Sequence, residues 1–328
     1  MNEQPRADVS VVIVNWNAAR FLPQCLKALQ QQTLQPERII VVDNASTDQS
    51  CELIASYPEV ELMALEDNVG FAQANNLAVS RCKTKWVALL NPDAFPRESW
   101  LENLLRQTYV SQNIAALGSL QLMAGHPGVV DGDGDAMHVS GLVWRRGYGC
   151  QGDMPGGAQR IVKSVFSVCA AAALYRRDAW VRVGGFDDDF FCYIEDVDLG
   201  FRLRLAGFEA VQVTDAIVTH VGSALTGGRR SDFSVYYGQR NLLWVYLKNM
   251  PEPLFWLFLP LHFLVQLGTV LRFSVAGHCK TIFLAKASAM RLLPAMWKKR
   301  RLIQRSRVAT TAMIWRALDK HLIVKRCR

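Results

Sequence analysis

Residues 9–43 decide the fold of this 328-residue chain, and they read VSVVIVNWNAARFLPQCLKALQQQTLQPERIIVVD. Two continuous apolar runs, at 9–14 and 38–43, flank a segment at about 18–31 whose apolar side chains recur with helical spacing. The same alternation continues downstream and predicts helices at 48–57 and 71–80 and strands at 60–65 and 86–90. Continuous apolar strands that alternate with helices are typical of a parallel sheet covered on both faces. We therefore predict an α/β fold with a single, Rossmann-like, mostly parallel sheet flanked by helices.

Polar residues follow three of these predicted strands. Asn15 and Asp43 end the first two, and Asn91-Pro92-Asp93 follows the fourth. Sheets of this kind bind ligands in the crevice beyond the carboxyl ends of their strands. The first strand lacks a following G-x-G-x-x-G, and no G-x-x-x-x-G-K-[ST] occurs in the sequence, which argues against a dinucleotide fold and a P-loop. We expect a ligand site of another kind at this edge.

Asp43 and the start of the helix at 71–80 are candidates for contact with a nucleoside. Asp43 ends a wholly apolar strand, so it is either a turn residue satisfied by its neighbours or an acceptor for the N3–H of a pyrimidine ring. Asn68, Gly70 and Asn75 lie around the helix entry, where a glycine permits a tight turn.

The most distinctive motif is Phe190-Phe-Cys-Tyr-Ile-Glu-Asp-Val-Asp-Leu199, which places three carboxylates within four residues. The apolar spacing that follows predicts a short helix, and Glu195, Asp196 and Asp198 therefore crowd its first turn. By itself, an acidic first turn is favoured by the helix dipole. A Gly184-Gly-Phe-Asp187 turn precedes the motif, and His220-Val-Gly-Ser223 follows a predicted strand downstream.

Taken together and in this order, these motifs resemble the inverting family 2 glycosyltransferases with a GT-A fold, particularly their bacterial rhamnosyltransferase-like branch. The resemblance covers roughly residues 9–241. It implies an enzyme that transfers a sugar from a nucleotide donor to a hydroxyl group and inverts the anomeric configuration.

The resemblance also implies roles for individual residues. Asp196 is the catalytic base, with Glu195 as the alternative. Asp93 and His220 hold Mg²⁺ or Mn²⁺ against the donor diphosphate; Asn91 replaces the first acid of the usual Asp-x-Asp and serves the ribose. The remaining residues divide into a nucleotide-binding group (Asn15, Asp43, Asn68, Gly70, Asn75 and Asn91) and contacts to acceptor or phosphate (Asp187, Glu195 and Ser223).

The donor and acceptor follow from the same resemblance. It implies L-rhamnose from dTDP-L-rhamnose, transferred to a lipid-linked or growing polysaccharide acceptor of the bacterial cell surface. The alternative is a UDP-hexose donor: UDP-galactose, UDP-N-acetylglucosamine or UDP-galactofuranose. A non-catalytic nucleotide-sugar-binding subunit and a nucleotidyltransferase are two further alternatives. The nucleotidyltransferase requires a glycine-rich, basic first loop, which is absent after Val14.

The glycine-rich middle of the chain, residues 121–159, contains Asp131-Gly-Asp-Gly-Asp135. The spacing suggests a calcium loop, but Ala136 and Leu142 stand where such a loop needs glycine and glutamate. We interpret the segment as a solvated, mobile excursion near the rim of the site. An apolar strand is predicted after it, at 165–176.

The C-terminal part of the chain differs in composition from the rest. Residues 240–328 carry 17 Lys/Arg and 2 Asp/Glu, against 20 and 27 in residues 1–239. Residues 254–271 are almost entirely apolar, which favours a membrane surface over nucleic acid as the partner of these basic residues. We predict a GT-A domain at 1–249 and a helical, membrane-associating tail at 250–328.

The expected location is the cytoplasm, with the enzyme peripheral or monotopic on the inner face of the bacterial inner membrane. Residues 1–8 are polar and show no signal-peptide pattern. The eight cysteines are scattered without a C-x-x-C pair, which predicts reduced thiols.

Overall fold

A single ten-stranded sheet forms the centre of the protein in the computed structural model, which describes residues 6–151, 162–222, 227–228 and 230–321. Its order is β10-β12-β6-β11-β4-β1-β2-β3, with β5 beside β12 and β7 beside β6. The strands are β1 (Arg6–Asn15), β2 (Gln35–Asp43), β3 (Val60–Ala64), β4 (Trp86–Leu90), β5 (Ala94–Pro96), β6 (Ile114–Met123), β7 (Val130–Gly132), β10 (Val162–Ser164), β11 (Ala172–Arg176) and β12 (Glu209–His220). Strands β3, β2, β1, β4, β6 and β12 run in one direction, and β11 is antiparallel between β4 and β6.

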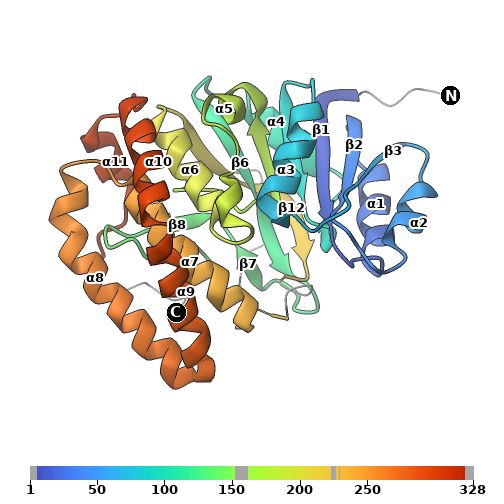
Figure 1. The fold of residues 1–328 in the computed structure, drawn as a ribbon. Helices are drawn as coiled ribbons and strands as arrows, with labels where there is room; N and C mark the ends of the chain where they lie inside the picture. Colours follow the sequence, from blue (N-terminus) through green and yellow to red (C-terminus); the bar gives the residue numbers. More distant parts are fainter. Residues whose placement is uncertain (1–5, 152–161, 223–226, 229, 322–328) are drawn as a thin grey trace.

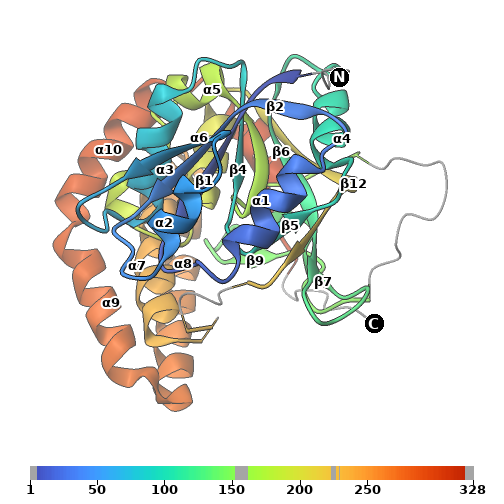
Figure 2. The same cartoon turned by 90° about the vertical axis from the view of Figure 1, so that its right-hand side faces the viewer.

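Helices cover both faces of this sheet, as the sequence predicts (Figures 1 and 2). Helices α1 (Leu22–Gln30) and α4 (Trp100–Gln107) pack on one face, where β1 contributes Val9, Val11 and Ile13. Helices α3 (Gly70–Arg81), α5 (Arg177–Arg182) and α6 (Glu195–Leu205) pack on the other, against Val12 and Val14. Because successive side chains of a strand point to opposite faces, a doubly covered strand must be apolar throughout. This confirms the predicted α/β class.

The elements of the first ninety residues lie close to their predicted positions, including the short α2 (Ser50–Ala55). The strand predicted at 165–176 is wrong over its first half, because β11 begins only at Ala172. Upstream, Phe166 N–H donates to the Asp135 carbonyl and Asp135 N–H donates to the Ser167 carbonyl. These bonds hold the chain beside a separate two-stranded sheet, β8 (Asp135–Met137) and β9 (Val143–Arg145), instead of in the main sheet.

The described part of the middle segment, 121–151, is folded, so its interpretation as a solvated and mobile excursion is wrong there. Strand β7 pairs with β6, and β8 pairs with β9. Asp131 and Asp135 are each only 4% exposed. These two carboxylates can be buried because both lie beside the positively charged Arg145 guanidinium. Residues 152–159 lie outside the described residues.

The prediction of reduced thiols also needs one correction. Six cysteines in the described part of the chain are free: Cys25, Cys51, Cys82, Cys169, Cys192 and Cys279. Cys150 is disulfide-bonded. Spacing along a chain does not reveal which cysteines meet in space, so the sequence pattern alone missed this bond.

The C-terminal helices share a hydrophobic cluster with α6 and the segment around β8. They are α7 (Asp232–Asn249), α8 (Leu254–Phe273), α9 (Cys279–Arg291), α10 (Leu293–Arg305) and α11 (Thr311–Ala317). Phe201 of α6, Trp244 of α7, Met296 of α10 and Ile314 of α11 are all buried in this cluster. Asp319 also exchanges backbone hydrogen bonds with Met137 and Val139. The boundary at residue 249 stays a prediction, and the tail beyond it packs on the core.

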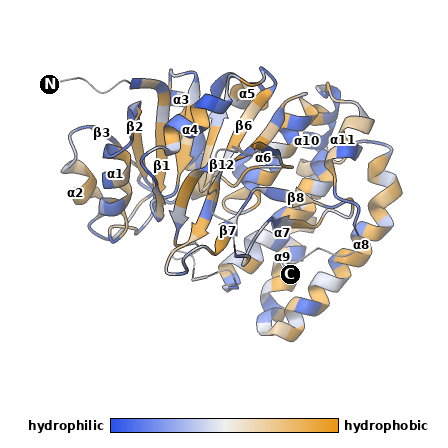
Figure 3. Ribbon diagram, turned by 180° about the vertical axis from the view of Figure 1, so that it is seen from behind, coloured by the Kyte–Doolittle hydropathy of each residue, from blue (hydrophilic) through white to orange (hydrophobic). Residues whose placement is uncertain are grey.

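Helices α8 and α9 form a protruding hairpin with an apolar outer surface (Figures 1 and 3). A π-helical turn, Ser274–His278, joins them, and Gly277 takes a φ of 93° there. Over the described residues, Leu254–Arg291 is the one helical stretch that is long and apolar enough to cross a membrane, by length and composition only. Only 22% of its most apolar window is buried. The large exposed side chains are Trp256, Leu257, Phe263, Leu264, Leu267, Leu271, Val275, Phe283, Leu284 and Met290.

Candidate active site

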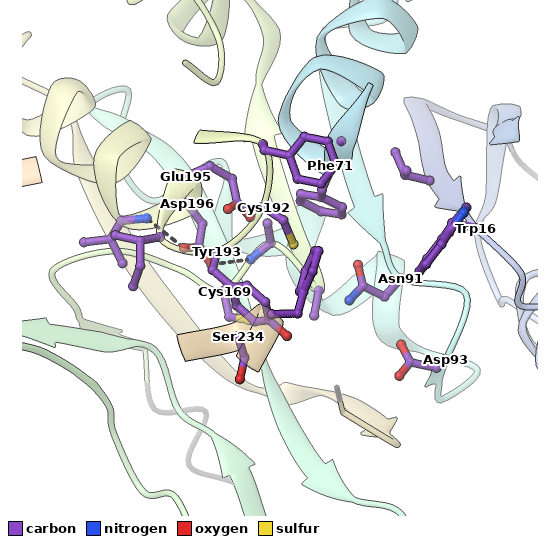
Figure 4. Close-up of a pocket in the computed structure, with 18 of the residues that line it drawn as sticks. Trp16, Phe71, Asn91, Asp93, Cys169, Cys192, Tyr193, Glu195, Asp196 and Ser234 are labelled. Carbon is purple, nitrogen blue, oxygen red and sulfur yellow. Dashed lines mark hydrogen bonds between the residues drawn. The ribbon is translucent and has the colours of Figure 1, made fainter. Parts of the chain in front are cut away.

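A cavity of about 680 Å³ opens at the carboxyl ends of β1 and β4 (Figure 4). Trp16, Asn91 and Asp93 lie at one end of it, and Glu195 and Asp196 lie at the other. Seven of the residues predicted from the sequence line it: Asn68, Gly70, Asn91, Asp93, Glu195, Asp196 and His220. These residues come from five different elements or loops, so the sheet edge brings together the motifs that the sequence presents separately.

Asp93 and His220 meet at the first end of the cavity because β5 pairs with the end of β12, where His220 faces Ala94. His220 Nε2 lies 3.4 Å from Asp93 Oδ1, and His220 Nδ1 lies 2.8 Å from Asp131 Oδ2. Gly222 N–H donates to Asp93 Oδ2 over 3.2 Å. Burial disfavours the charged imidazole, but the two carboxylates outweigh it and raise the pKa of His220.

This end of the cavity has ligands that suit a divalent cation. His220 Nε2 is buried and has no hydrogen-bond partner, and it faces a carboxylate oxygen. No group of three or more His, Cys, Asp or Glu side chains forms a complete metal site among the residues that the structure describes. Two protein ligands nevertheless fit Mg²⁺ or Mn²⁺, because such ions commonly complete their coordination with substrate phosphates and water. Asp93 and His220 therefore fit a cation held jointly by the protein and a diphosphate.

Glu195 and Asp196 begin α6 at the second end of the cavity. Asp196 accepts hydrogen bonds from Ala170 N–H (3.2 Å) and Val197 N–H (2.8 Å). Burial raises the pKa of Asp196, although Arg145 opposes the shift. Glu195 is 5% exposed, and its Oε2 has no partner. Burial and the neighbouring Asp196 raise the pKa of Glu195 well above its usual range. Raised carboxyl pKa values are typical of groups that accept or donate protons.

The loop that leads into α6 has a strained backbone. Phe191, Tyr193 and Ile194 have φ values of 63°, 67° and 70°, which non-glycine residues rarely adopt. The Asn241 amide donates to the carbonyls of residues 190, 192 and 193 over 2.7–3.0 Å. Arg240 adds bonds to the carbonyls of residues 189 and 190. Helix α7 therefore holds the loop that aims the carboxylates of α6 into the cavity.

Several residues that line the cavity were not predicted from the sequence. Arg145 lines the cavity, with its guanidinium 3.3 Å from Asp131, 3.9 Å from Asp135 and 2.6 Å from the Cys169 sulfur. The Asp131-to-Asp135 motif is the one sequence signal for this cluster, because its closely spaced carboxylates need a buried cation such as the Arg145 guanidinium. Trp16, Asn44, Phe71 and Phe233 also line the cavity and were not singled out.

Four predicted site residues in the described part of the chain lie outside the cavity lining: Asn15, Asp43, Asn75 and Asp187. Asp43 accepts from Asn15 Nδ2 (2.7 Å) and Ser46 N–H (2.9 Å), which is the turn role that the sequence left open. Asn75 donates to the Phe71 carbonyl within its own helix. Asp187 is ion-paired with Lys248 and Lys299. Ser223 lies outside the described residues.

Comparison with known proteins places these observations in a family. Residues 10–181 match the model of "Glycosyl transferase family 2", and residues 156–315 match "Glycosyl transferase family group 2". The chain is 29% identical over 244 residues to the N-acetylglucosaminyl-diphospho-decaprenol L-rhamnosyltransferase of Mycobacterium tuberculosis, covering 66% of this chain and 77% of that protein. It is 25% identical over 217 residues to the O-antigen chain rhamnosyltransferase RfbN of Salmonella typhimurium, covering 65% and 66%.

Solved structures show the same fold at lower identity. A mannosyltransferase from Pyrobaculum calidifontis, solved with GDP-Man and Mn²⁺, matches with a TM-score of 0.55 and 17% identity over 95% of this chain and 86% of its own. GalNAc-T7, solved with UDP, GalNAc and Mn²⁺, matches with a TM-score of 0.59 and 15% identity over 77% and 49%. Both likenesses support a GT-A-like sheet. Since the family model spans more than half of the sequence, the chain belongs to glycosyl transferase family 2 and is a glycosyltransferase.

Proposed function

We propose that the protein transfers L-rhamnose from dTDP-L-rhamnose to a hydroxyl of a lipid-linked glycan, with inversion at the anomeric carbon. The observation that carries the proposal is the single cavity with Asp196 at one end and the Asp93–His220 pair at the other. Inversion by one displacement needs a base on the face of the sugar opposite the leaving group, and such an arrangement offers both positions. The two rhamnosyltransferase relatives support the choice of sugar.

Asp196 acts as the base in this proposal. Its carboxylate accepts the proton of the acceptor hydroxyl while the oxygen of that hydroxyl bonds to the anomeric carbon. The bond between the anomeric carbon and the diphosphate oxygen breaks, and its electron pair leaves with the nucleoside diphosphate. A positioned base contributes a factor of about 10²–10⁴ in rate. Glu195 is the alternative base, but it is more buried, and its pKa is raised more strongly.

Asp93 and His220 hold Mg²⁺ or Mn²⁺ in this proposal. When bound, the cation neutralises charge on the departing diphosphate as a Lewis acid. Asp93 is held by Gly222 N–H and His220 by Asp131, so both ligands are oriented before the donor arrives. The two aspartates thus have different roles in the proposal: Asp93 binds the cation at one end of the cavity, and Asp196 accepts the proton at the other.

The nucleoside lies on the β1 side of the cavity, where Trp16, Asn44, Asn68 and Asn91 line the wall. Asn44 and Asn68 are hydrogen-bonded to one another over 2.9 Å. Asp43 directly precedes Asn44 in the chain, and in this proposal it accepts the N3–H of uracil or thymine after a rearrangement of its bond to Asn15. A UDP-hexose is the alternative donor, because these residues would contact only the nucleoside of the donor and do not distinguish one sugar from another.

The hairpin of α8 and α9 attaches the enzyme to the cytoplasmic leaflet in this proposal. Exposed fractions of 62%, 64% and 67% for Phe263, Leu264 and Leu271 support burial in lipid. Exposed Lys298, Arg301 and Arg305 supply positive charge for anionic headgroups. Lys299 and Arg300 belong to the same basic tail but have internal partners: Asp187 and Asp189 for Lys299, and the carbonyls of residues 247 and 250 for Arg300.

A donor panel tests the chemistry. The full-length protein is incubated with a bacterial lipid-linked acceptor fraction, Mn²⁺ and dTDP-L-rhamnose, UDP-galactose, UDP-N-acetylglucosamine or UDP-galactofuranose in turn. We expect transfer from dTDP-L-rhamnose to exceed that from the other donors, with an inverted linkage by NMR. Faster transfer from a UDP-sugar would replace the donor assignment, and a retained anomeric configuration would overturn the mechanism.

Flotation with anionic vesicles tests the membrane contact. We expect Leu264→Ser/Leu267→Ser/Leu271→Ser to reduce flotation strongly. The control is Tyr109→Ser/Val110→Ser, because these side chains are 87% and 67% exposed on another part of the surface. Truncation at residue 249 is unsuitable, since it removes the tail's share of the hydrophobic cluster around Phe201 and Trp244. Equal flotation of both variants and wild type would contradict the assignment of the hairpin.

A further inference from the structure

The Asp131-Gly-Asp-Gly-Asp135 motif places its three carboxylates in three different environments. Asp131 lies on β7, which pairs with β6, and β6 pairs in turn with β12, whose last residue is His220. Asp135 lies beside Arg145 and accepts from the Ser167 hydroxyl. Asp133 pairs with the partly exposed Lys163 over 3.2 Å. Only Asp131 of the three contacts one of the two proposed metal ligands in the described structure.

The contact between Asp131 and His220 determines which ring nitrogen of the imidazole carries the hydrogen. The Nδ1–Oδ2 distance is 2.8 Å, and both side chains are 6% exposed. An ionised carboxylate only accepts hydrogen bonds, so Nδ1 carries the hydrogen in this pair. In the neutral ring, the lone pair of Nε2 then points toward Asp93 Oδ1, 3.4 Å away.

The opposite tautomer would close the site. With its hydrogen on Nε2, His220 would donate a hydrogen bond to Asp93. Neither Nε2 nor that lone pair of the Asp93 oxygen could then bind a cation. Asp131 disfavours this arrangement because its carboxylate would then face the lone pair of Nδ1. Arg145 contacts the same carboxylate oxygen, since its Nη1 lies 3.3 Å from Asp131 Oδ2.

We propose that Asp131 is a positioning residue for the metal site, acting through His220 to keep Nε2 available beside Asp93. The inference rests on the proposed metal role of Asp93 and His220. Partners that orient a ligating histidine typically change metal affinity by about 10–100-fold when they are removed. Asp131 therefore belongs to the metal-binding machinery although it lies in a segment far from both ligands in the sequence.

The test measures Mn²⁺ binding to the full-length protein by EPR, first with Mn²⁺ alone and then with dTDP or with UDP, the nucleoside diphosphates of the proposed and the alternative donors. We expect Asp131→Asn to weaken Mn²⁺ affinity by about tenfold or more, because the neutral amide no longer requires a hydrogen on Nδ1. Asp133→Asn is the matched control: it makes the same chemical change two residues away and should leave the affinity unchanged.

A measurement on the wild-type protein avoids dependence on the folding of the variant. In spectra of protein labelled with ¹⁵N-histidine and loaded with Mg²⁺, we expect His220 to carry its hydrogen on Nδ1. A hydrogen on Nε2 would overturn the inference, as would unchanged Mn²⁺ affinity in a folded Asp131→Asn protein. Both results leave the proposed function standing if wild type binds Mn²⁺. Failure of wild type to bind Mn²⁺ both with dTDP and with UDP present would overturn the metal role and the inference together.

Discussion

The two ends of the cavity are built by different physical means. The end proposed to bind the nucleoside rests on β1, β2 and β4, whose core residues are apolar and nearly fully buried. The carboxylate end rests on a strained loop held by polar contacts from a helix some fifty residues later. The first end is stabilised mainly by burial of apolar surface, and the second by specific hydrogen bonds and ion pairs.

A buried ion network shows this difference most clearly. Asp187, in the turn before the carboxylates, pairs with Lys248 of α7 and Lys299 of α10. Burial opposes ionisation of Asp187, but the two lysines outweigh it and lower its pKa. Asp198 pairs with Arg202 (2.7 Å) and Lys248 (2.9 Å). The C-terminal helices therefore help to position the carboxylate end of the cavity as well as carrying the apolar hairpin.

Metal removal should produce the largest effect, and it should act on the nucleoside end. We expect EDTA to abolish transfer and Mn²⁺ or Mg²⁺ to restore it. Asp93→Ala should weaken binding of the nucleoside diphosphate by calorimetry when Mn²⁺ is present, with little change in EDTA. Asp178→Ala, a change at an exposed carboxylate paired with Arg176, serves as the control. Full activity in chelator would remove the proposed metal roles of Asp93 and His220.

Asp196→Asn should separate the two ends of the cavity. The substitution keeps the shape and removes the proton acceptor, so we expect the transfer rate to fall by about 10²–10⁴. Nucleotide affinity, measured by calorimetry, should stay near wild type because Asp196 lies at the opposite end from Asp93. Glu195→Gln is the comparison variant. If Asp196→Asn keeps more than about a tenth of the wild-type rate, Glu195 becomes the base.

Lys248→Met tests whether the ion network supports the carboxylate end. Lys248 is 1% exposed, and its removal takes away one positive partner from each of two buried carboxylates, Asp187 and Asp198. We expect the free energy of unfolding to fall by about 3–5 kcal/mol in a denaturant titration. Lys298→Met, at an exposed site on α10, should change it by no more than about 0.5 kcal/mol. Similar stability of the two variants would show that the network contributes little.

The smallest effect concerns pH. Because burial raises the pKa of Asp196, the base is protonated at a higher pH than an ordinary aspartate. The transfer rate should therefore decline, as the pH is lowered, before the usual aspartate value of about 3.9 is reached. The measurement is kcat against pH, with nucleotide affinity followed in parallel. A flat profile down to that value would argue against Asp196 as the titrating base.

Much of the candidate site was predictable because its motifs lie at strand or helix ends. Asp93, Glu195, Asp196 and His220 all reach the predicted cavity. Asp131 and Arg145 were not predicted as site residues, because Asp131 is placed by the pairing of β7 with β6 and Arg145 by the pairing of β9 with β8, and no local pattern indicates either pairing. Asp187 reads locally as a turn residue near the site, but its lysine partners are 61 and 112 residues away along the chain.

The sequence by itself determined the α/β class, the order of the first strands and helices, and the acidic first turn of α6. Each of these depends on side-chain periodicity or on residues within a few positions of each other. Only the tertiary structure decided that Asp131 contacts His220, that Asn241 holds the loop before Glu195, and that Lys299 pairs with Asp187. Those contacts join segments far apart in the chain, and a polar side chain carries no local signal of which distant group will satisfy it once both are buried.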